Sequence, residues 1–420
     1  MTKTNSHTDK IKSILPNLVE WINLFSTIFL VTTLILPFIY QRIALYTFFI
    51  STILDVIINQ RYTNLKWNKI KWLFIIMIVF YLCIWIWHIF EESNLRHFQK
   101  VTENRLPFLA FGILGLFCNI NPKLKPQYLA FPMLLTAILS SSFILINIIK
   151  NSPSSFIEYQ QLFEYYRYTT LKTLHMNFNL YLNFSIMFGF YALTTTSKRW
   201  IKIALLICIC IIFLFIFTSE GRIGFFTGTI LMIGFICYNI IKYNKKLAAP
   251  IITLSCILFP YLILNHQRVK NSDISLDPRH VIWEHSINLI KEKPLLGYGV
   301  SDGRKAFIEH RTENEKFSTY YLNDLYSIEP DLKNTYVPHP HNVFIESTIE
   351  FGIIGLILIC SIMILPIVLT KGKKQLFSII TIFIFGVQAM FEVLWVLFPP
   401  IYLCLFLYII ILIPTDEKIK

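Results

Sequence analysis

Arg279 stands at a predicted helix start, where it could bind an anion. The residues Asp277-Pro278-Arg279 are typical of a helix N-terminus, with Asp as the N-cap and Pro in the first turn. Free backbone N–H groups and the helix dipole favour negative charge there, and an arginine can hold a phosphate through two hydrogen bonds. The alternative is that Arg279 only closes its loop by pairing with Asp273, Asp277 or Glu284.

Arg222 lies between two apolar segments with almost no loop before it, after Thr218-Ser219-Glu220-Gly221. A charged side chain at the edge of an apolar layer is costly, and it is a functional candidate for that reason. The alternative is an ordinary arginine that extends to the surface and pairs with Glu220.

His341 lies in a Pro-His-Pro-His-Asn run at 338–342, directly before an apolar segment. An imidazole at such a position can act as a general base at neutral pH, or it can simply satisfy hydrogen bonds at an interface. The spacing of His339 and His341 also resembles part of a metal site, but no cysteine or carboxylate follows at a fixed spacing. We therefore expect neither a metal nor another cofactor.

The chain around these residues is too apolar for a soluble protein. Of its 420 residues, 55% are hydrophobic and 15% are charged, whereas soluble domains carry about 25% charged residues. The apolar residues form blocks of about 16–25, the length that crosses a hydrocarbon core. The eight cysteines all fall inside these blocks, without a CxxC pair. These features exclude a soluble enzyme, a secreted disulfide scaffold and a disordered chain, and they predict an all-α polytopic membrane protein.

Twelve apolar blocks are predicted to span the membrane. They cover residues 20–40, 42–59, 71–90, 105–120, 127–149, 176–196, 200–218, 222–241, 247–265, 343–369, 376–396 and 398–414. Residues 1–265 would then hold nine spans, 266–342 one large loop, 343–414 three spans and 415–420 a tail.

The basic residues indicate how these spans are oriented. A net charge of +13 would suggest a nucleic-acid ligand in a soluble protein, but here Lys and Arg punctuate the apolar blocks. With a cytoplasmic N-terminus, 20 of the 38 Lys and Arg lie in cytoplasmic segments and 8 in short outer segments. Because membrane proteins keep their basic loops inside, we predict that both termini are cytoplasmic and that the large loop is outside. No nucleic-acid partner is expected.

The 266–342 loop resembles a soluble domain in composition. It holds six of the ten histidines, and a loop of this length is usually functional or contains helices of its own. A helix is predicted from Asp277 to about Lys291, before Pro294. A Gly-Tyr-Gly turn at 297–299 and a polar, Tyr-rich stretch would follow.

Four other charged residues are weaker candidates. Arg105 heads a predicted span at the outer face, where it could touch a lipid pyrophosphate. Arg167 lies among tyrosines, in a segment that could be an aromatic belt or a sugar-stacking shelf. Asp55 and Glu392 fall within predicted apolar spans, where they could couple proton movement in a transporter or be paired inside the bundle.

The predicted topology places Arg222, Arg279 and His341 on the same, outer face of the membrane. Two cations and one titratable base suit a pyrophosphate leaving group and a hydroxyl nucleophile. Lipid-linked sugar donors carry their pyrophosphate at the bilayer surface. The three residues together therefore favour glycosyl transfer.

At His341 the sequence also resembles a known family. His341-Asn342, nine residues and then Gly352-Ile353-Ile354-Gly355 match the H-N-x9-G-x-x-G signature of the O-antigen ligase family. That family includes O-antigen polymerases and bacterial O-linked oligosaccharyltransferases. The twelve-span layout with its large outer loop is similar too. Further similar features are the 277–279 helix start, Trp283, the run at 293–299 and Arg222 after a Thr-Ser pair.

Two details depart from the family pattern. Family members usually carry Ser directly before the first of the two arginines, whereas Glu220 and Gly221 intervene here between Ser219 and Arg222. The span after the middle loop often begins with several histidines, and here only His175 stands there.

The resemblance implies an inverting, metal-independent glycosyltransferase of the GT-C type in the inner membrane, with its active site facing the periplasm. Its donor would be a glycan on undecaprenyl pyrophosphate. The acceptor would be a sugar of lipid A–core for a ligase, or another lipid-linked repeat unit for a polymerase. Arg222 and Arg279 would bind the pyrophosphate, and His341 would accept the proton of the acceptor hydroxyl.

The resemblance also gives roles to less prominent residues. Gly352 and Gly355 would let a neighbouring helix approach closely and so fix His341 at the start of its span. Secondary site candidates are Arg105, Asn342, His175 and Arg167.

Other functions compete with a ligase. A repeat-unit polymerase of the same family is the nearest alternative, and a protein-targeting oligosaccharyltransferase is the third. The long outer loop favours a ligase slightly. The competing class is a transporter or flippase of lipid-linked glycan, which would be expected to show internal repeats or helices broken near mid-membrane. The candidate residues gather at one face instead.

Overall fold

The computed structural model describes residues 5–63, 67–89, 95–119, 121–173, 175–219, 221–243, 253, 278–313, 340–392, 394, 401 and 405–408. Regular secondary structure in these ranges is helical throughout, and they contain no strand. The predicted all-helical class is therefore confirmed for this part of the chain.

Six helices in the described ranges are long and apolar enough to cross a membrane, as expected of a membrane protein. They are α1 (Asn5–Thr33), α2 (Phe38–Ile58), α3 (Lys71–His88), α5 (Pro126–Lys150), α8 (Arg199–Thr218) and α15 (Val343–Leu369). The twelve-span layout and its orientation stay predictions. The predicted span at 247–265, apart from residue 253, and most of that at 398–414 lie outside the described residues.

The remaining helices are shorter or more polar. They are α4 (Leu95–Phe117), α6 (Phe156–Tyr166), a π-helical turn η1 (Arg167–Leu171), α7 (His175–Thr195), α9 (Arg222–Tyr243), α12 (Pro278–Glu292), α13 (Val300–Glu313) and α16 (Lys373–Ala389).

Several predicted boundaries were wrong, for local reasons. Helix α1 ends at Thr33 and α2 begins at Phe38, because Pro37 disfavours a helical residue before it and starts the next helix well. Helix α4 begins at Leu95, before the predicted span at 105–120, so Arg105 lies inside a helix and not at its start. Helix α16 ends at Ala389, which leaves Glu392 in the turn beyond it.

Two helices were not predicted because they lack an apolar block. Helix α6 is started by Ser155, whose side chain accepts a hydrogen bond from the Glu158 backbone N–H. Helix α13 occupies the beginning of the polar stretch after the Gly-Tyr-Gly turn, and Asp302 in its first turn suits the positive end of the helix dipole.

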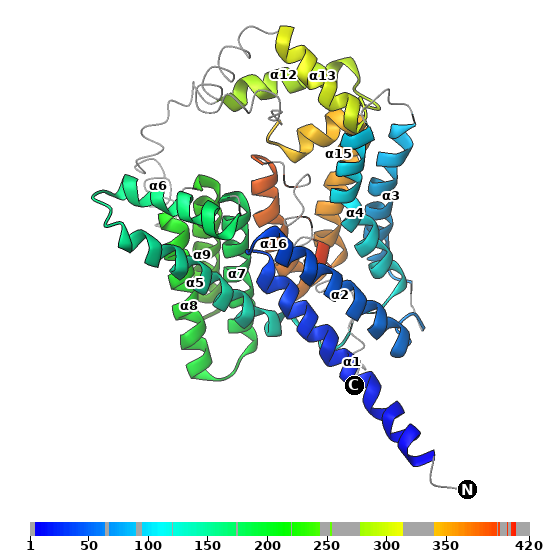
Figure 1. Cartoon of the computed structure of the whole chain (residues 1–420), viewed down its shortest axis with the longest axis vertical. Helices are drawn as coiled ribbons and strands as arrows, with labels where there is room; N and C mark the ends of the chain where they lie inside the picture. Colours follow the sequence, from blue (N-terminus) through cyan, green and yellow to red (C-terminus); the bar gives the residue numbers. More distant parts are fainter. Residues whose placement is uncertain are drawn as a thin grey trace.

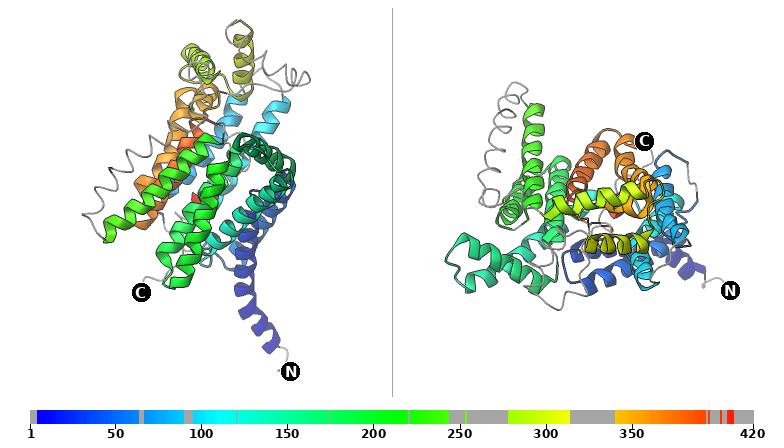
Figure 2. Two further views of the ribbon diagram at one scale, coloured as in Figure 1. Left: turned by 90° about the vertical axis from the view of Figure 1, so that its left-hand side faces the viewer. Right: turned by 90° about the horizontal axis from the view of Figure 1, so that it is seen from above.

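Helices α12 and α13 lie crosswise over the end of the bundle at which α15 begins (Figure 1 and Figure 2). Below them, α15 packs against α3 and α16, and α7 packs against α5, α8, α9 and α16. Every residue of α7 from 178 to 190 is buried. Helix α1 begins at the opposite end of the molecule from α12 and α13 (Figure 1).

Ring contacts and hydrogen bonds show which helix ends lie together. Helices α7 and α16 are antiparallel, because Phe184 packs on Phe385 and Phe188 on Phe377. The start of α7 therefore lies beside the end of α16, which in turn contacts the residue before α15 through a bond from Asn342 to the Met390 carbonyl. The end of α16 and the starts of α7 and α15 thus share one end of the bundle.

A buried ion pair joins the two sides of this end. The Arg105 guanidinium on α4 donates to both carboxylate oxygens of Glu350 on α15, at 2.7 and 2.9 Å. Arg105 is 1% exposed and lies against the rings of Phe80 and Phe351. Such a bidentate pair fixes the distance and rotation between two helices.

We predict that Arg105→Met lowers the free energy of unfolding by about 3–5 kcal/mol, because it leaves the buried Glu350 carboxylate unpaired. The double variant Arg105→Met with Glu350→Leu should recover most of this loss. Thermal unfolding of the purified protein in detergent measures both, with the exposed Arg42→Met as a matched control. A double variant as unstable as the single one would show that Arg105 does more than balance Glu350.

Candidate active site

Asn342 determines where α15 begins. Its side-chain oxygen accepts hydrogen bonds from the backbone N–H groups of Phe344 and Ile345, at 2.9 and 3.1 Å. Its amide nitrogen donates to the Met390 carbonyl at 3.1 Å. Asn342 is therefore an N-cap that also attaches the 390–392 turn to the start of α15. A role as a direct substrate ligand stays a prediction.

His341 immediately precedes this cap and has a left-handed backbone, with φ 49°. Such a conformation is costly for a residue with a side chain and is often found at functional sites. The imidazole is 22% exposed, and its Nδ1 lies 3.5 Å from Oε2 of Glu392. A carboxylate at Nδ1 favours the tautomer with the proton on that atom, which leaves Nε2 able to accept one.

Arg279 reaches the same carboxylate from α12. Its guanidinium lies 3.7 Å from Oε1 of Glu392, and its Cζ is 5.9 Å from the centre of the Phe391 ring. The arginine is one-third exposed, whereas Glu392 is 8% exposed. Of the carboxylates proposed to close the loop with Arg279, Asp273 and Asp277 lie outside the described residues. In the described residues, Arg279 forms an ion pair with Glu392.

Trp283 holds α12 over this site. Its indole N–H donates to the Pro340 carbonyl at 2.9 Å, and its ring lies beside Phe391 with the centroids 6.2 Å apart. One turn of α12 thus carries both Arg279 and the side chain that fixes the backbone next to His341.

Helix α15 is broken at Gly352, where φ is 61° and ψ is −151°. The break frees backbone groups that the 293–299 segment satisfies. Tyr298 and Gly299 donate their N–H groups to the carbonyls of Ile349 and Glu350, at 2.9 and 2.8 Å, and Ile353 donates to Pro294 at 2.9 Å. The 293–299 segment therefore packs on α15 at the helix break around Gly352.

The two glycines of the G-x-x-G motif make contacts that differ from the expectation. A Cβ at Gly352 would lie 2.3 Å from the Leu295 carbonyl, and one at Gly355 would lie 2.2 Å from the Ser347 carbonyl of the same helix. These glycines therefore do not make room for a neighbouring helix. Gly352 makes room for the loop at Leu295, and Gly355 makes room for the carbonyl of Ser347 across the helix break.

Tyr298, in the docked 293–299 segment, is hydrogen-bonded to the end of α12. Its hydroxyl donates to the Glu292 carboxylate at 2.5 Å. Partial burial and this carboxylate both raise the pKa of Tyr298 above its usual range. The phenol is therefore a stable hydrogen-bond donor at neutral pH, and it ties α12 to the segment that docks on α15.

Arg222 begins α9 at the same end of the bundle. Asn179 on α7 accepts a hydrogen bond from Ser219 at 2.9 Å, and Asn183 donates to the Gly224 carbonyl at 3.1 Å. A Cβ at Gly221 or Gly224 would collide with the Asn179 side chain. The backbone at Arg222 is therefore held close to the start of α7. Its side chain, like that of His175 and the backbone of Glu220, lies outside the described part of the chain.

Three other candidates have partners of their own. Arg105 is bound by Glu350, as described above. Arg167 is buried and pairs with Glu164, one turn earlier on α6. Asp55 pairs with Arg61 at 2.5 Å, in agreement with the paired alternative for that residue.

Glu392 is the residue whose role the sequence did not reveal. In the sequence it is noticeable only as a carboxylate in an apolar segment, and its neighbours Arg279 and His341 come from distant parts of the chain. The assembled group is a base, a carboxylate that can orient it and a cation that can bind an anion. Such a group can remove a proton from a hydroxyl and stabilise a negatively charged leaving group.

Comparison with known proteins identifies the region that holds most of these residues. Residues 180–360 match the family model described as O-antigen ligase. The matched range includes α8, α9, α12, His341 and the break in α15, and it ends before Glu392. The resemblance noted from the motif is therefore confirmed. The match fits a membrane protein that acts as a transferase in polysaccharide biosynthesis.

Two curated relatives match over part of their length. One is a Rickettsia conorii protein named as a candidate polysaccharide ligase, 27% identical over 136 residues. The other is an uncharacterized protein of Haemophilus influenzae, 25% identical over 167 residues. The matches cover 30% and 35% of this chain and 30% and 38% of those proteins.

We predict that Gly352→Ala destabilises the protein by about 1–3 kcal/mol, because alanine resists the positive φ, and that the clash with the 293–299 segment adds to this loss. The matched control is Gly386→Ala on α16, where a Cβ would be 3.5 Å from Met363. Protease resistance of the loop and thermal unfolding report the effect. Equal stability of the two variants would contradict the docking described here.

Proposed function

We propose that this protein is a glycosyltransferase of the ligase type. It would move a glycan from undecaprenyl pyrophosphate to a hydroxyl of lipid A–core, at the periplasmic face of the inner membrane. The single observation that carries the proposal is the Glu392 carboxylate, which lies within 3.7 Å of both the candidate base His341 and the candidate pyrophosphate ligand Arg279. The match to the O-antigen ligase family supports the donor class.

In this mechanism His341 is the general base. Its Nε2 accepts the proton of the acceptor hydroxyl while that oxygen attacks the anomeric carbon of the donor sugar. The bond from that carbon to the pyrophosphate oxygen breaks on the opposite side, so the configuration inverts. The bonding electrons leave with undecaprenyl pyrophosphate, and the proton stays on the imidazolium until it passes to water.

Arg279 and Arg222 would take the charge that develops on the leaving group. The N-terminus of α12 adds its dipole and free backbone N–H groups on the side of Arg279. Arg222 begins α9 in the same way, at the same end of the bundle. Two helix starts with one arginine each suit a diphosphate, which carries charge on two phosphorus centres. The proposal requires no metal ion.

Glu392 would act as a positioning residue. Its negative charge favours the imidazolium that forms on His341, in the manner of the carboxylate in a catalytic triad. It also competes with the donor for Arg279. When pyrophosphate draws that arginine away, Glu392 keeps its contact with His341, so donor binding strengthens the base at the moment it is needed.

A repeat-unit polymerase would use the same chemistry with a different acceptor. The name of the Rickettsia conorii relative favours a ligase. The transporter alternative receives no support from a base and two cations gathered at one end of the bundle.

We predict that His341→Ala lowers glycan transfer by about 10²–10⁴-fold, the usual contribution of a general base. The surface glycan profile on a gel, in a strain lacking the protein and complemented by each variant, checks this. His88→Ala at the end of α3 is the histidine control.

The same gel separates the proposed reactions. Uncapped cores with long chains still on the lipid carrier support a ligase, and cores with a single repeat unit support a polymerase instead. Unchanged glycan with His341→Ala at normal expression would exclude His341 as the base.

We predict that Glu392→Gln lowers turnover by at least about tenfold, since an amide cannot stabilise the imidazolium. The apparent affinity for the donor should become tighter, because the neutral side chain no longer competes with the donor for Arg279. Arg279→Lys should act in the opposite way and lower the affinity for the donor, because lysine cannot bind phosphate through a planar pair of hydrogen bonds. In vitro transfer from a synthetic lipid-linked donor measures both. The exposed Glu284→Gln on α12 is the matched control, and equal losses in turnover and affinity for Glu392→Gln would argue against a positioning role.

A further inference from the structure

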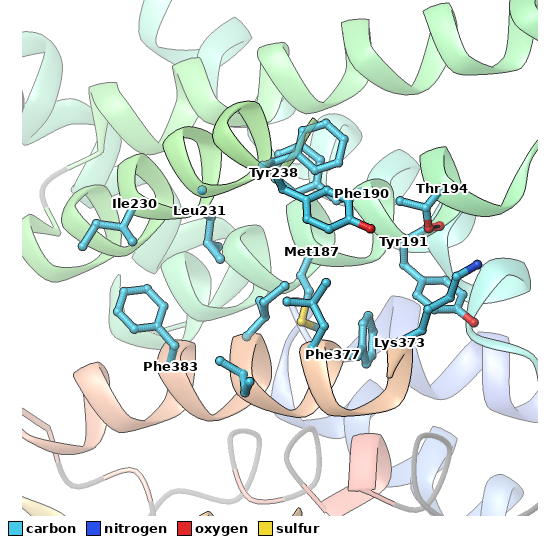
Figure 3. A pocket seen from close by; sticks show the side chains of 15 residues that line it. Met187, Phe190, Tyr191, Thr194, Ile230, Leu231, Tyr238, Lys373, Phe377 and Phe383 are labelled. Carbon is cyan, nitrogen blue, oxygen red and sulfur yellow. Dashed lines mark hydrogen bonds between the residues drawn. The ribbon is translucent and has the colours of Figure 1, made fainter. Parts of the chain in front are cut away.

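An apolar cavity lies among α7, α9 and α16 (Figure 3). Its volume is about 320 Å³, and its wall is built mainly of aromatic and aliphatic side chains. Phe190 and Phe235 stack within that wall, with their ring centroids 3.8 Å apart. A space of this size accepts part of a small molecule or of a lipid chain.

The cavity is polar at one end only. Figure 3 shows Lys373, Tyr191 and Thr194 at one side of the space and Ile230 and Phe383 at the other. Lys373 is exposed and opens α16. A cavity with a cation at its mouth and hydrocarbon behind it matches a lipid with an anionic head and an apolar chain.

This polar end is remote from the candidate active site. Helix α16 runs from Lys373 to the turn that holds Glu392, and α7 runs antiparallel to it. Helix α15 begins beside His341 and is long enough to cross a membrane. Lys373 follows the end of α15 and therefore lies at the opposite membrane surface from His341.

The surface around Lys373 is strongly basic. Further exposed cations at this end come from the segments after α7 and before α16. They are Lys198, Arg199, Lys202, Lys371 and Lys374. Basic pockets between transmembrane helices attract anionic lipid headgroups.

We propose that this cavity binds one anionic glycerophospholipid. Its phosphate lies at Lys373 and the start of α16, and one acyl chain lies between α7, α9 and α16. The chain of the undecaprenyl donor is a less suitable occupant, because its charge is at the other membrane surface and its far end offers nothing for Lys373 to bind. The site is independent of the proposed glycan transfer.

Native mass spectrometry of the full-length protein in detergent tests this site, with phosphatidylglycerol and phosphatidylcholine of the same acyl chains as probes. We expect one phosphatidylglycerol to be retained, about tenfold more readily than phosphatidylcholine, a difference of about 1.4 kcal/mol. Because the measurement reads lipid retention, His341→Ala should bind like the wild type even if the proposed catalytic role fails.

Two variants remove the site in different ways. Gly234→Phe fills the cavity from α9, where a Cβ meets no atom within 4 Å and folding should be undisturbed. Lys373→Gln removes the cation at the mouth. Each should lower phosphatidylglycerol retention about tenfold. The matched controls are Ile236→Phe, on an exposed position of α9, and Lys150→Gln, at the exposed end of α5, neither of which lines the cavity.

Three outcomes would overturn the proposal. The first is equal retention by Gly234→Phe and the wild type. The second is equal retention of the two phospholipids, which would indicate unselective contact with the apolar surface. The third is undecaprenyl phosphate that displaces phosphatidylglycerol from the wild type but does not bind Gly234→Phe, which would assign the cavity to an isoprenoid chain.

Discussion

The break in α15 at Gly352 is the constraint on which the candidate site depends. Its positive φ separates the short first part of the helix, which follows His341, from the long apolar part below. The freed carbonyls and N–H group would be costly in an apolar setting unless they were bonded. They are bonded by the 293–299 segment, which connects α12 to α13. Arg279 on α12 is thereby brought over His341, although 61 residues separate the two in the chain.

The ion pair between Arg105 and Glu350 strengthens the same junction from the other side. Glu350 offers its backbone carbonyl to Gly299 and its carboxylate to Arg105, so one residue joins α4, α15 and the docked loop. A bundle in lipid gains little from the hydrophobic effect between helices and depends on packing and polar contacts. Charges buried in such a junction are therefore understandable as positioning elements, even where they add little stability.

Much of the bundle could be predicted from hydropathy, because α3, α5, α7, α8, α9 and α15 lie within two residues of predicted spans. Polar helices such as α13 have no comparable signal. The start of α15 at Val343 was predicted as well, from the beginning of the apolar block, whereas the capping role of Asn342 was not. The function of the G-x-x-G glycines was not, because spacing does not reveal a positive φ at Gly352. In the sequence, Glu392 stood out as a charge within an apolar segment, but nothing there pairs it with His341 and Arg279.

The distances around Glu392 indicate what this carboxylate does before a donor is bound. Separations of 3.5 and 3.7 Å are those of ion pairs and are longer than direct hydrogen bonds. The Glu392 carboxylate therefore lies between the Arg279 guanidinium and the His341 imidazole. In the proposed mechanism, a pyrophosphate that approaches Arg279 would meet a second negative charge, and the repulsion would be relieved as the arginine turns to the donor. The same movement would leave Glu392 to stabilise the imidazolium that forms on His341, and so would link the energy of binding the leaving group to the stability of the protonated base.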